Sequence, residues 1–452
     1  MNERINITIL PMTLGAFLAA LDNKVLNICL PLVAKEFGTD IATAQFVSSS
    51  YVFTICSLLL IFANISSAVG RRYIFSLGIG IFGLGSLAAA FAPNIGALIF
   101  FRVVQGVGAA MFMANGMALV HSHFSNEVKA RAFGILASAT AGASIIGPVL
   151  GGVVASWAGW RAVFFLLVPL AVLAGVLAPK LLNQEDTSPV RDFDRLGTIW
   201  STLFVLLFFG SLFYLNNGQI LVFAAVIILA VFFLRLFILE ERRAKNPLVN
   251  MTAFAQPIFI RANALAGMMF AIMMAAGIIL PVYVHDSLGY PAFYAGLVLA
   301  AMAVSILAVS YIGGLLADKI GTQLIINMGI ILVILGMSLL GISTYLRLDW
   351  PLFPANVVLG MGIGFFNPAN NKVVMVSVPH NLGASAASIN VLLRNAGIAL
   401  GTVTSGLCYT FFLNLVAEPA LAAFYSLLVF VVISLLMLVI SLPGSATTER
   451  GC

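Results

Sequence analysis

Long apolar runs recur along the whole chain, and this feature most restricts the folds available to it. The sequence has 452 residues, of which 62% are hydrophobic and 8% are charged. No water-soluble core of this length buries so much apolar surface, so lipid must be the solvent for most of the chain. A bilayer core about 30 Å thick is crossed by roughly 20 residues of α-helix. Runs of that order alternate with short polar breaks from one end of the sequence to the other.

We therefore predict about fourteen transmembrane helices. The runs are continuous and lack the alternation of period two expected of a barrel strand, which favours helices over a transmembrane barrel. The predicted spans cover residues 7–31, 45–67, 73–91, 95–120, 131–155, 162–182, 196–214, 219–238, 259–283, 292–316, 323–345, 352–376, 384–413 and 421–442.

Two polar breaks near the middle of the chain, 183–195 and 240–250, indicate how the helices are grouped. We predict an all-α polytopic membrane protein with two six-helix bundles plus two inserted helices. Residues 1–182 form the N-terminal bundle, 183–250 the linker and inserted helices, and 251–452 the C-terminal bundle. A glycine turn with basic flanks follows the second and the tenth predicted helix, at Gly70–Arg71 and at Asp318–Gly321, which supports an internal duplication.

The lysines and arginines of the short loops predict the orientation. If the N-terminus is cytoplasmic, most of them fall on the cytoplasmic side, and Lys35, Arg161 and Arg347 remain outside. We therefore predict a multi-pass protein of a cell membrane, with a bacterial inner membrane favoured and both termini cytoplasmic. The net charge of +6 follows this loop pattern and forms no continuous patch, so no nucleic-acid partner is expected. The short loops offer little surface for a protein partner, which favours a functional monomer.

A membrane-embedded enzyme is the competing class, and the sequence argues against it. It contains no HExxH pattern, no phosphate-binding glycine loop and no soluble domain that would house a cofactor. The four cysteines, at 29, 56, 408 and 452, are dispersed, so neither a disulfide framework nor a metal site is expected. We predict a protein that is not an enzyme and has no cofactor.

Five segments, in order on the expected helices, resemble the motifs of the major facilitator superfamily. They are Leu21–Asp22 with Asn27 and Leu30–Pro31; Arg102 with Gln105, Gly106 and Gly108; Gly147–Pro148 to Gly151–Gly152; Gly159–Trp160–Arg161 with Pro169; and Asp318 to Gly321. The first and fourth are similar to those of the fourteen-helix drug/proton antiporter branch. The resemblance implies a proton-coupled secondary transporter that exports a small organic molecule by alternating access. It also implies a gating or packing role for Gly70, Arg71, Gly147, Pro148, Gly151, Gly152, Asp318 and Gly321.

Three departures from that branch concern the cargo more than the fold. Leu167 replaces an asparagine that is usual after Trp160–Arg161. Ser67 stands where the first-half loop motif usually carries aspartate, and Lys24 stands where a small hydroxyl residue is usual. The resemblance therefore implies an exporter, and these departures argue against a multidrug exporter in particular. An importer or exchanger of an organic anion or metabolite is the alternative within transport.

Asp22 is the one carboxylate that lies deep in a predicted helix, and it is the leading candidate for the proton carrier. A charged aspartate at mid-bilayer costs about 2.5–3.5 kcal/mol on insertion scales, so it needs a cavity or a partner. Arg102, at a similar depth in the fourth predicted helix, is that partner. A pair that breaks in one conformation would couple proton to cargo, whereas a permanent ion pair is the alternative.

The remaining candidates are polar side chains that would line a substrate cavity: Lys24, Asn27, Gln105, Asn367, Asn370, Arg394 and Asn395. Lys24 is rotated by about 200° from Asp22, so the two cannot share a helix face. Lys24 either snorkels outward or meets an anionic cargo. With one buried acid against three buried bases, a neutral, zwitterionic or anionic cargo fits better than a dication.

Overall fold

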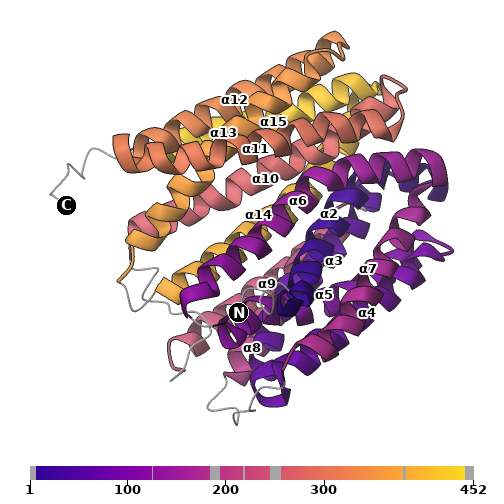
Figure 1. The fold of residues 1–452 in the computed structure, drawn as a ribbon. Helices are drawn as coiled ribbons and strands as arrows, with labels where there is room; N and C mark the ends of the chain where they lie inside the picture. Colours follow the sequence, from indigo (N-terminus) through magenta and orange to yellow (C-terminus); the bar gives the residue numbers. More distant parts are fainter. Residues whose placement is uncertain are drawn as a thin grey trace. The chain divides into compact units, whose positions relative to one another are not determined.

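The computed structural model describes residues 7–124, 126–183, 194–216, 219–244, 256–379 and 383–442 (Figure 1). Within these ranges the chain forms fourteen α-helices and no strand. The helices are α2 (Leu10–Phe37), α3 (Ile41–Val69), α4 (Arg71–Ala90), α5 (Ile95–His123), α6 (Asn126–Ala158), α7 (Trp160–Leu181), α8 (Arg195–Asn216), α9 (Ile220–Glu241), α10 (Pro257–Asp286), α11 (Ala292–Ile320), α12 (Thr322–Leu346), α13 (Leu352–Val376), α14 (Gly383–Val416) and α15 (Pro419–Ser441).

These helices confirm the predicted all-α polytopic fold. In the described part of the chain, 13 helices are long and apolar enough to cross a membrane, and α8 carries a shorter apolar stretch, Leu196–Ser211. The protein is therefore embedded in a lipid bilayer by many consecutive spans.

The end of the first span is the clearest error of the sequence prediction. We expected it to end at Pro31, but α2 continues to Phe37 with Pro31 inside it. Transmembrane helices tolerate an internal proline because neighbouring helices satisfy the freed backbone group. The helix ends instead at Gly38, whose left-handed φ of 63° lets its N–H bond to the Ala34 carbonyl.

Contacts divide the chain into two compact units. Unit 1 comprises Met1–Val249 with Tyr290–Leu297, and unit 2 comprises Asn250–Gly289 with Val298–Cys452. In unit 1, α2 packs on α6 and α7, and α5 packs on α3 and α4. In unit 2, α12 packs on α13 and α15, and α10 packs on α14, as Figure 1 shows. The predicted three-part division of the chain stays a prediction.

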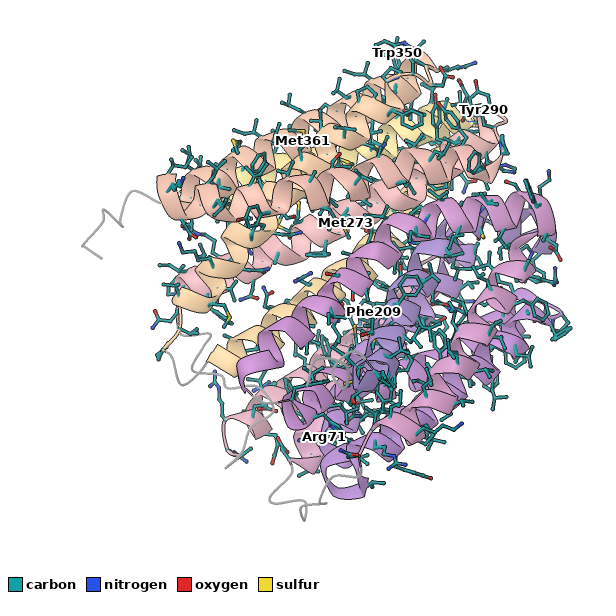
Figure 2. The ribbon with its side chains drawn as sticks, viewed as in Figure 1. Arg71, Phe209, Met273, Tyr290, Trp350 and Met361 are labelled. Carbon is teal, nitrogen blue, oxygen red and sulfur yellow. The ribbon has the colours of Figure 1, made fainter. Side chains whose placement is uncertain are left out.

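Helices α8 and α9 belong to unit 1 and attach to it through α3. The rings of Phe53 and Phe209 stack with centroids 3.8 Å apart, and the Thr202 hydroxyl donates to the Ser57 carbonyl at 3.1 Å. Phe209 is labelled in Figure 2. Apolar side chains of α9 such as Leu221 and Ile228 are exposed, as lipid-facing residues are.

Ion pairs fix helix ends in each unit. In unit 1, Arg161 at the start of α7 pairs with Glu36 at the end of α2. In unit 2, Arg347 at the end of α12 pairs with Glu418 just before α15. These pairs lie at polar helix ends, where the charges reach water, so each adds only about 0–1 kcal/mol to the contact between its helices.

The same close helix contact is built twice. A Cβ added to Gly78 of α4 would lie 2.7 Å from the Gly108 carbonyl oxygen of α5. In unit 2, a Cβ added to Gly329 of α12 would lie 2.8 Å from the Gly362 carbonyl oxygen of α13. Small residues let transmembrane backbones approach this closely, and the repetition supports the internal duplication seen in the sequence.

Replacing Gly78 with alanine tests this packing. We expect Gly78→Ala to lower the free energy of unfolding by about 1–3 kcal/mol, because the new methyl group meets backbone atoms that cannot yield. Gly80→Ala, on the same helix but with no atom within 4 Å of the added Cβ, is the control and should be neutral. Thermal unfolding of both variants in detergent measures the difference, and equal stability would contradict the close contact.

Candidate functional site

An ion pair buried in unit 1 is the centre of the candidate site. Nη1 of Arg102, on α5, lies 2.8 Å from both carboxylate oxygens of Asp22, on α2. The two side chains are 0% and 1% exposed. The structure thus brings together the two residues that the sequence proposed as proton-coupling partners, and it does so away from water and lipid.

Gln105 and Ser86 complete the hydrogen bonding of the pair. The Gln105 amide donates to Asp22 Oδ1 at 2.9 Å and to the Ser86 hydroxyl at 2.8 Å, and its oxygen accepts from Arg102 Nη1. Arg102 Nε donates to the Val47 carbonyl at 3.0 Å. The network therefore joins α2, α3, α4 and α5. A buried charge persists only with such multiple hydrogen bonds.

The local sequence explains how the network is assembled. Arg102 and Gln105 are three residues apart on α5 and so lie on one helix face. One residue further, a Cβ on Gly106 would lie 2.9 Å from the Tyr51 carbonyl oxygen, so only glycine allows α3 to approach this closely. The Tyr51 ring consequently lies 4.2 Å from the Arg102 guanidinium carbon, a cation–π contact that stabilises the charge.

Some polar atoms around the pair have no partner. Among the described residues, Arg102 Nη2, the Tyr51 hydroxyl and both side-chain amide atoms of Gln45 are buried without a hydrogen bond. Buried polar groups are rarely left in this state. Arg102 therefore keeps a free donor after binding Asp22, and it is able to bond a further acceptor without first releasing the carboxylate.

Asn27 forms a second polar contact between α2 and α3. Its Oδ1 accepts from the Ser48 hydroxyl at 2.8 Å, and the residue is 4% exposed. Asn27 and Gln105 were predicted to line a substrate cavity. The structure places both in buried hydrogen-bonded positions between helices, where they join α2, α3 and α5, and their role in a substrate cavity stays a prediction.

The glycine segment of α6 packs against α2. A Cβ on Gly147 would lie 2.7 Å from Lys24 Cβ, and one on Gly151 would lie 2.8 Å from the Val25 carbonyl oxygen. Gly152 faces Ala292, in the 290–297 segment of unit 1, and Pro148 lies inside the helix. Lys24 is half-buried and has no ion-pair partner among the residues that the structure describes.

In unit 2 the predicted cavity residues fall on α13 and α14. Asn370 is buried and donates to the Ala262 carbonyl at 3.0 Å, while Asn367 and Asn395 are half-buried. The Arg394 guanidinium carbon lies 4.3 Å from the centre of the Phe270 ring of α10.

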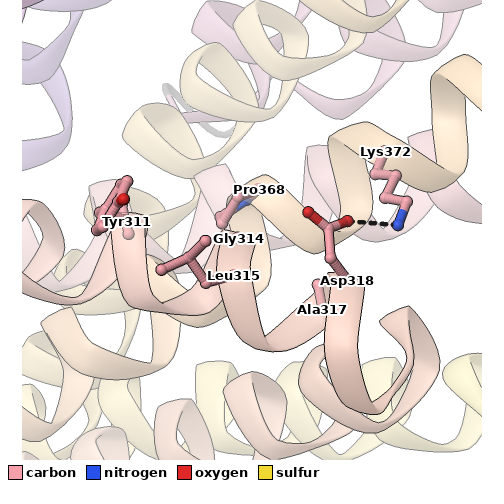
Figure 3. Close-up of a pocket in the computed structure, with 8 residues that line it drawn as sticks. Tyr311, Gly314, Leu315, Ala317, Asp318, Pro368 and Lys372 are labelled. Carbon is pink, nitrogen blue, oxygen red and sulfur yellow. Dashed lines mark hydrogen bonds and ion pairs between the residues drawn. The ribbon is translucent and has the colours of Figure 1, made fainter.

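The two loop motifs adopt equivalent turns. Gly70 (φ 110°) joins α3 to α4 before Arg71, and Gly321 (φ 103°) joins α11 to α12. Asp318 pairs with Lys372 of α13 at 2.6 Å, beside a hollow of about 360 Å³ that Tyr311, Leu315 and Pro368 also line (Figure 3). The side chain of Ser67 lies outside the described residues.

Sequence reasoning missed several contributors to the site: Ser86, Tyr51, the Val47 carbonyl and the hydrogen bond from Asn390 to Asn263. Ser86 carried a weak signal, because it is a hydroxyl in an otherwise apolar run. The others gave none, because their role depends on which helices are neighbours.

The comparison with known families decides the class of the protein. A family model described as Major Facilitator Superfamily matches residues 12–402. The chain belongs to this superfamily. It is thus a membrane transporter of a small-molecule substrate and not an enzyme.

This major facilitator is similar to several named bacterial proteins. The riboflavin transporter RibZ of Clostridioides difficile (strain 630) is 27% identical over 407 residues, covering 88% of this chain and 86% of RibZ. The multidrug resistance protein Stp of Mycobacterium tuberculosis (strain CDC 1551 / Oshkosh) is 26% identical, covering 93% of this chain and 79% of Stp. The puromycin resistance protein pur8 of Streptomyces alboniger is 29% identical, covering 90% of this chain and 80% of pur8. These relatives agree with the drug-efflux branch that the motifs resemble.

Solved structures agree on the fold. A bacterial homologue of the human lysosomal transporter Spinster matches with a TM-score of 0.70 at 14% identity, covering 98% of this chain and 96% of that chain. The peptide transporter POT in complex with sulfate matches with a TM-score of 0.72 at 15% identity, covering 96% of this chain and 94% of that chain.

A double-mutant cycle tests the buried pair. Asp22→Asn and Arg102→Met should each lower the free energy of unfolding by about 3–5 kcal/mol, because each removes one partner of a buried pair. The free energy of unfolding of the double variant should fall by less than the sum of the two single losses, since no uncompensated charge remains.

The matched control is the Arg161–Glu36 pair of the same unit, whose side chains are 36% and 44% exposed. Arg161→Met and Glu36→Gln should show a coupling of only about 0–1 kcal/mol. Unfolding in detergent measures both cycles. Strictly additive losses at Asp22 and Arg102 would contradict the structural account of the pair.

Proposed function

We propose that this major facilitator is a proton-coupled secondary active transporter that exports a small organic molecule by alternating access. One observation carries the proposal: Asp22 is the only carboxylate placed well inside a described helix, and it is held by Arg102. The other acidic residues of the described helices lie in a first or last turn. An ionisable group at that depth is the natural carrier of a proton across the bilayer.

The geometry suggests how a proton would act. When Asp22 is ionised, it binds Arg102 and holds α2 against α5. Protonation removes the negative charge, so the attraction is lost and Arg102 needs another acceptor. A conformation that supplies this acceptor is favoured by protonation, and the proton therefore shifts the balance between two states of the transporter.

The direction of transport rests on the relatives. Stp and pur8 are named for resistance to drugs, which export from the cell explains, and RibZ is named as a riboflavin transporter. Export must be driven by an ion gradient in this proposal. A potential of 100 mV supplies about 2.3 kcal/mol per elementary charge. Import or exchange of an organic anion is the alternative outcome of the transport test.

The proposed setting is a bacterial inner membrane, with both termini in the cytoplasm and the protein active as a monomer. The loop lysines and arginines support this orientation. Single cysteines in a background without the four native ones test it. Thr187→Cys should react with a membrane-impermeant maleimide only after the membrane is permeabilised, whereas Asn217→Cys should react in intact cells. The reverse pattern would contradict the orientation.

Replacing Asp22 with asparagine tests the coupling. Asp22→Asn keeps the size of the side chain but removes the proton site, so proteoliposomes with an imposed pH gradient should no longer accumulate cargo. Cargo exchange without a gradient needs no net proton movement and should continue. The Asp22→Asn/Arg102→Met double variant repeats the test without an unpaired charge. Normal gradient-driven accumulation by a folded Asp22→Asn protein would contradict the proton-carrier role.

Energy coupling is tested separately on the unaltered protein. A protonophore should collapse transport, whereas ATP depletion should not while the gradient is maintained, because the chain has no nucleotide-binding motif. Transport that survives the protonophore would show a uniporter.

A further inference from the structure

A second membrane-embedded charge, Arg394 in unit 2, has no role in the proposed proton site. It lies roughly three turns into α14, about 17 Å along the helix axis, inside the candidate membrane span Ile389–Val416. Its guanidinium carbon lies 4.3 Å from the Phe270 ring centre, and the side chain is half-buried. An aromatic face stabilises a guanidinium only partly, and it leaves the N–H groups at its edge free to bind an anion.

Unit 2 cannot balance this charge from its own helix interiors. Its acidic residues are Asp286, Asp318, Asp349, Glu418 and Glu449. Asp286 and Asp318 lie in last turns, and Asp349 and Glu418 lie between helices. Asp318 already binds Lys372, and Glu418 already binds Arg347. Within the described residues, Arg394 has neither an ion pair nor a hydrogen-bond acceptor.

Neutral polar side chains lie on α14, α10 and α13 near the position of Arg394 along α14. Asn390, one turn before Arg394, donates to Asn263 Oδ1 of α10 at 3.0 Å. Asn370 of α13 donates to the Ala262 carbonyl, and its own Oδ1 is buried without a partner. Asn390 and Arg394 thus share one face of α14 against α10, and Asn370 bonds to the residue beside Asn263; this Arg394 cluster offers an unmatched cation among neutral polar groups.

Tight backbone packing holds this cluster in place. A Cβ on Gly401 of α14 would meet the backbone of Ala271 of α10, and one on Gly397 would meet the backbone of Gly267. Both contacts lie within two turns of Arg394 on the same helix face. A rigid pair of helices holds the guanidinium in one place, as a binding site requires.

We propose that this cluster is a cargo subsite and that the cargo is an organic carboxylate. The proposal rests on the transport function proposed above. Arg394 binds the carboxylate by charge-assisted hydrogen bonds, and the buried asparagines hold the helices around it in place. The proton site of unit 1 and the carboxylate subsite of unit 2 are then separate sets of residues.

The charge of the cargo determines how many charges cross the membrane in each transport cycle. If one proton enters for each monoanion that leaves, two charges move across the membrane in each cycle. A neutral cargo would move one charge, and a monocation would move none. Membrane potential alone should therefore drive export of a carboxylate more strongly than export of its neutral analogue.

Binding of three matched probes tests the subsite in the purified full-length protein. The probes are 2-naphthoate, 2-naphthamide and 2-naphthylmethylammonium, which share an aromatic body and differ in charge. We expect 2-naphthoate to bind about tenfold more tightly than the amide, the difference that a charge-assisted hydrogen bond supplies. Arg394→Gln should abolish this preference, and Arg394→Lys should keep part of it.

The control is Arg261→Gln, which removes a cation near the start of α10 that donates to the Leu442 carbonyl at 3.4 Å. Arg261→Gln should leave the preference for 2-naphthoate over the amide unchanged. The part of this preference that Arg394→Lys keeps shows that the site still folds when Arg394 is replaced. Equal binding of acid and amide, or a preference that survives Arg394→Gln, would overturn the proposal. Binding in detergent involves no gradient, so this result is independent of whether Asp22 couples transport to protons.

Discussion

A carboxylate that is removed from water and lipid needs a partner, and the Asp22–Arg102 ion pair is the interaction on which the arrangement of unit 1 depends. The pair is 2.8 Å long and fully buried, and four helices contribute to it. Either charge alone would be costly in this environment, while the two together with Gln105 and Ser86 form a hydrogen-bonded network in which one donor, Arg102 Nη2, is left without a partner. The same property makes the pair sensitive to a proton, because adding one to Asp22 removes the charge that the network is built around.

Close backbone packing makes this network possible. Gly106 brings α3 against α5, and the contact of Gly78 with Gly108 brings α4 against α5, so that Ser86 and Tyr51 reach the pair from either side. In unit 2 the equivalent contact of Gly329 with Gly362 is preserved, but the charge there is Arg394, on a different helix and without an acid. The duplicated scaffold thus carries two different polar sites. In the proposed mechanism the first site carries a proton and the second binds an anion.

Much of this architecture could be predicted from the sequence, because the length of an apolar run fixes a transmembrane helix almost by itself. The pairing of Asp22 with Arg102 could be predicted too, since both are charged, both lie deep in their helices, and their depths agree. The end of α2 could not, because Pro31 is a strong break signal in water and a weak one in a membrane. The hydrogen-bond partners of Gln105 and Asn27 could not either. A polar side chain in a helix gives no sign of whether it faces a cavity or a neighbouring helix until the neighbours are known.

The central claim is that Asp22 itself gains and loses the transported proton. Infrared difference spectroscopy of the purified protein, recorded as the pH is lowered, measures this directly through the carbonyl stretch of a protonated carboxyl group. The account predicts a band that appears on acidification in the unaltered protein, shifts when the cargo binds, and is missing in Asp22→Asn. A band that is the same in the unaltered protein and in Asp22→Asn would contradict the account, because Asp22 would then stay ionised over the pH range in which transport responds to the gradient.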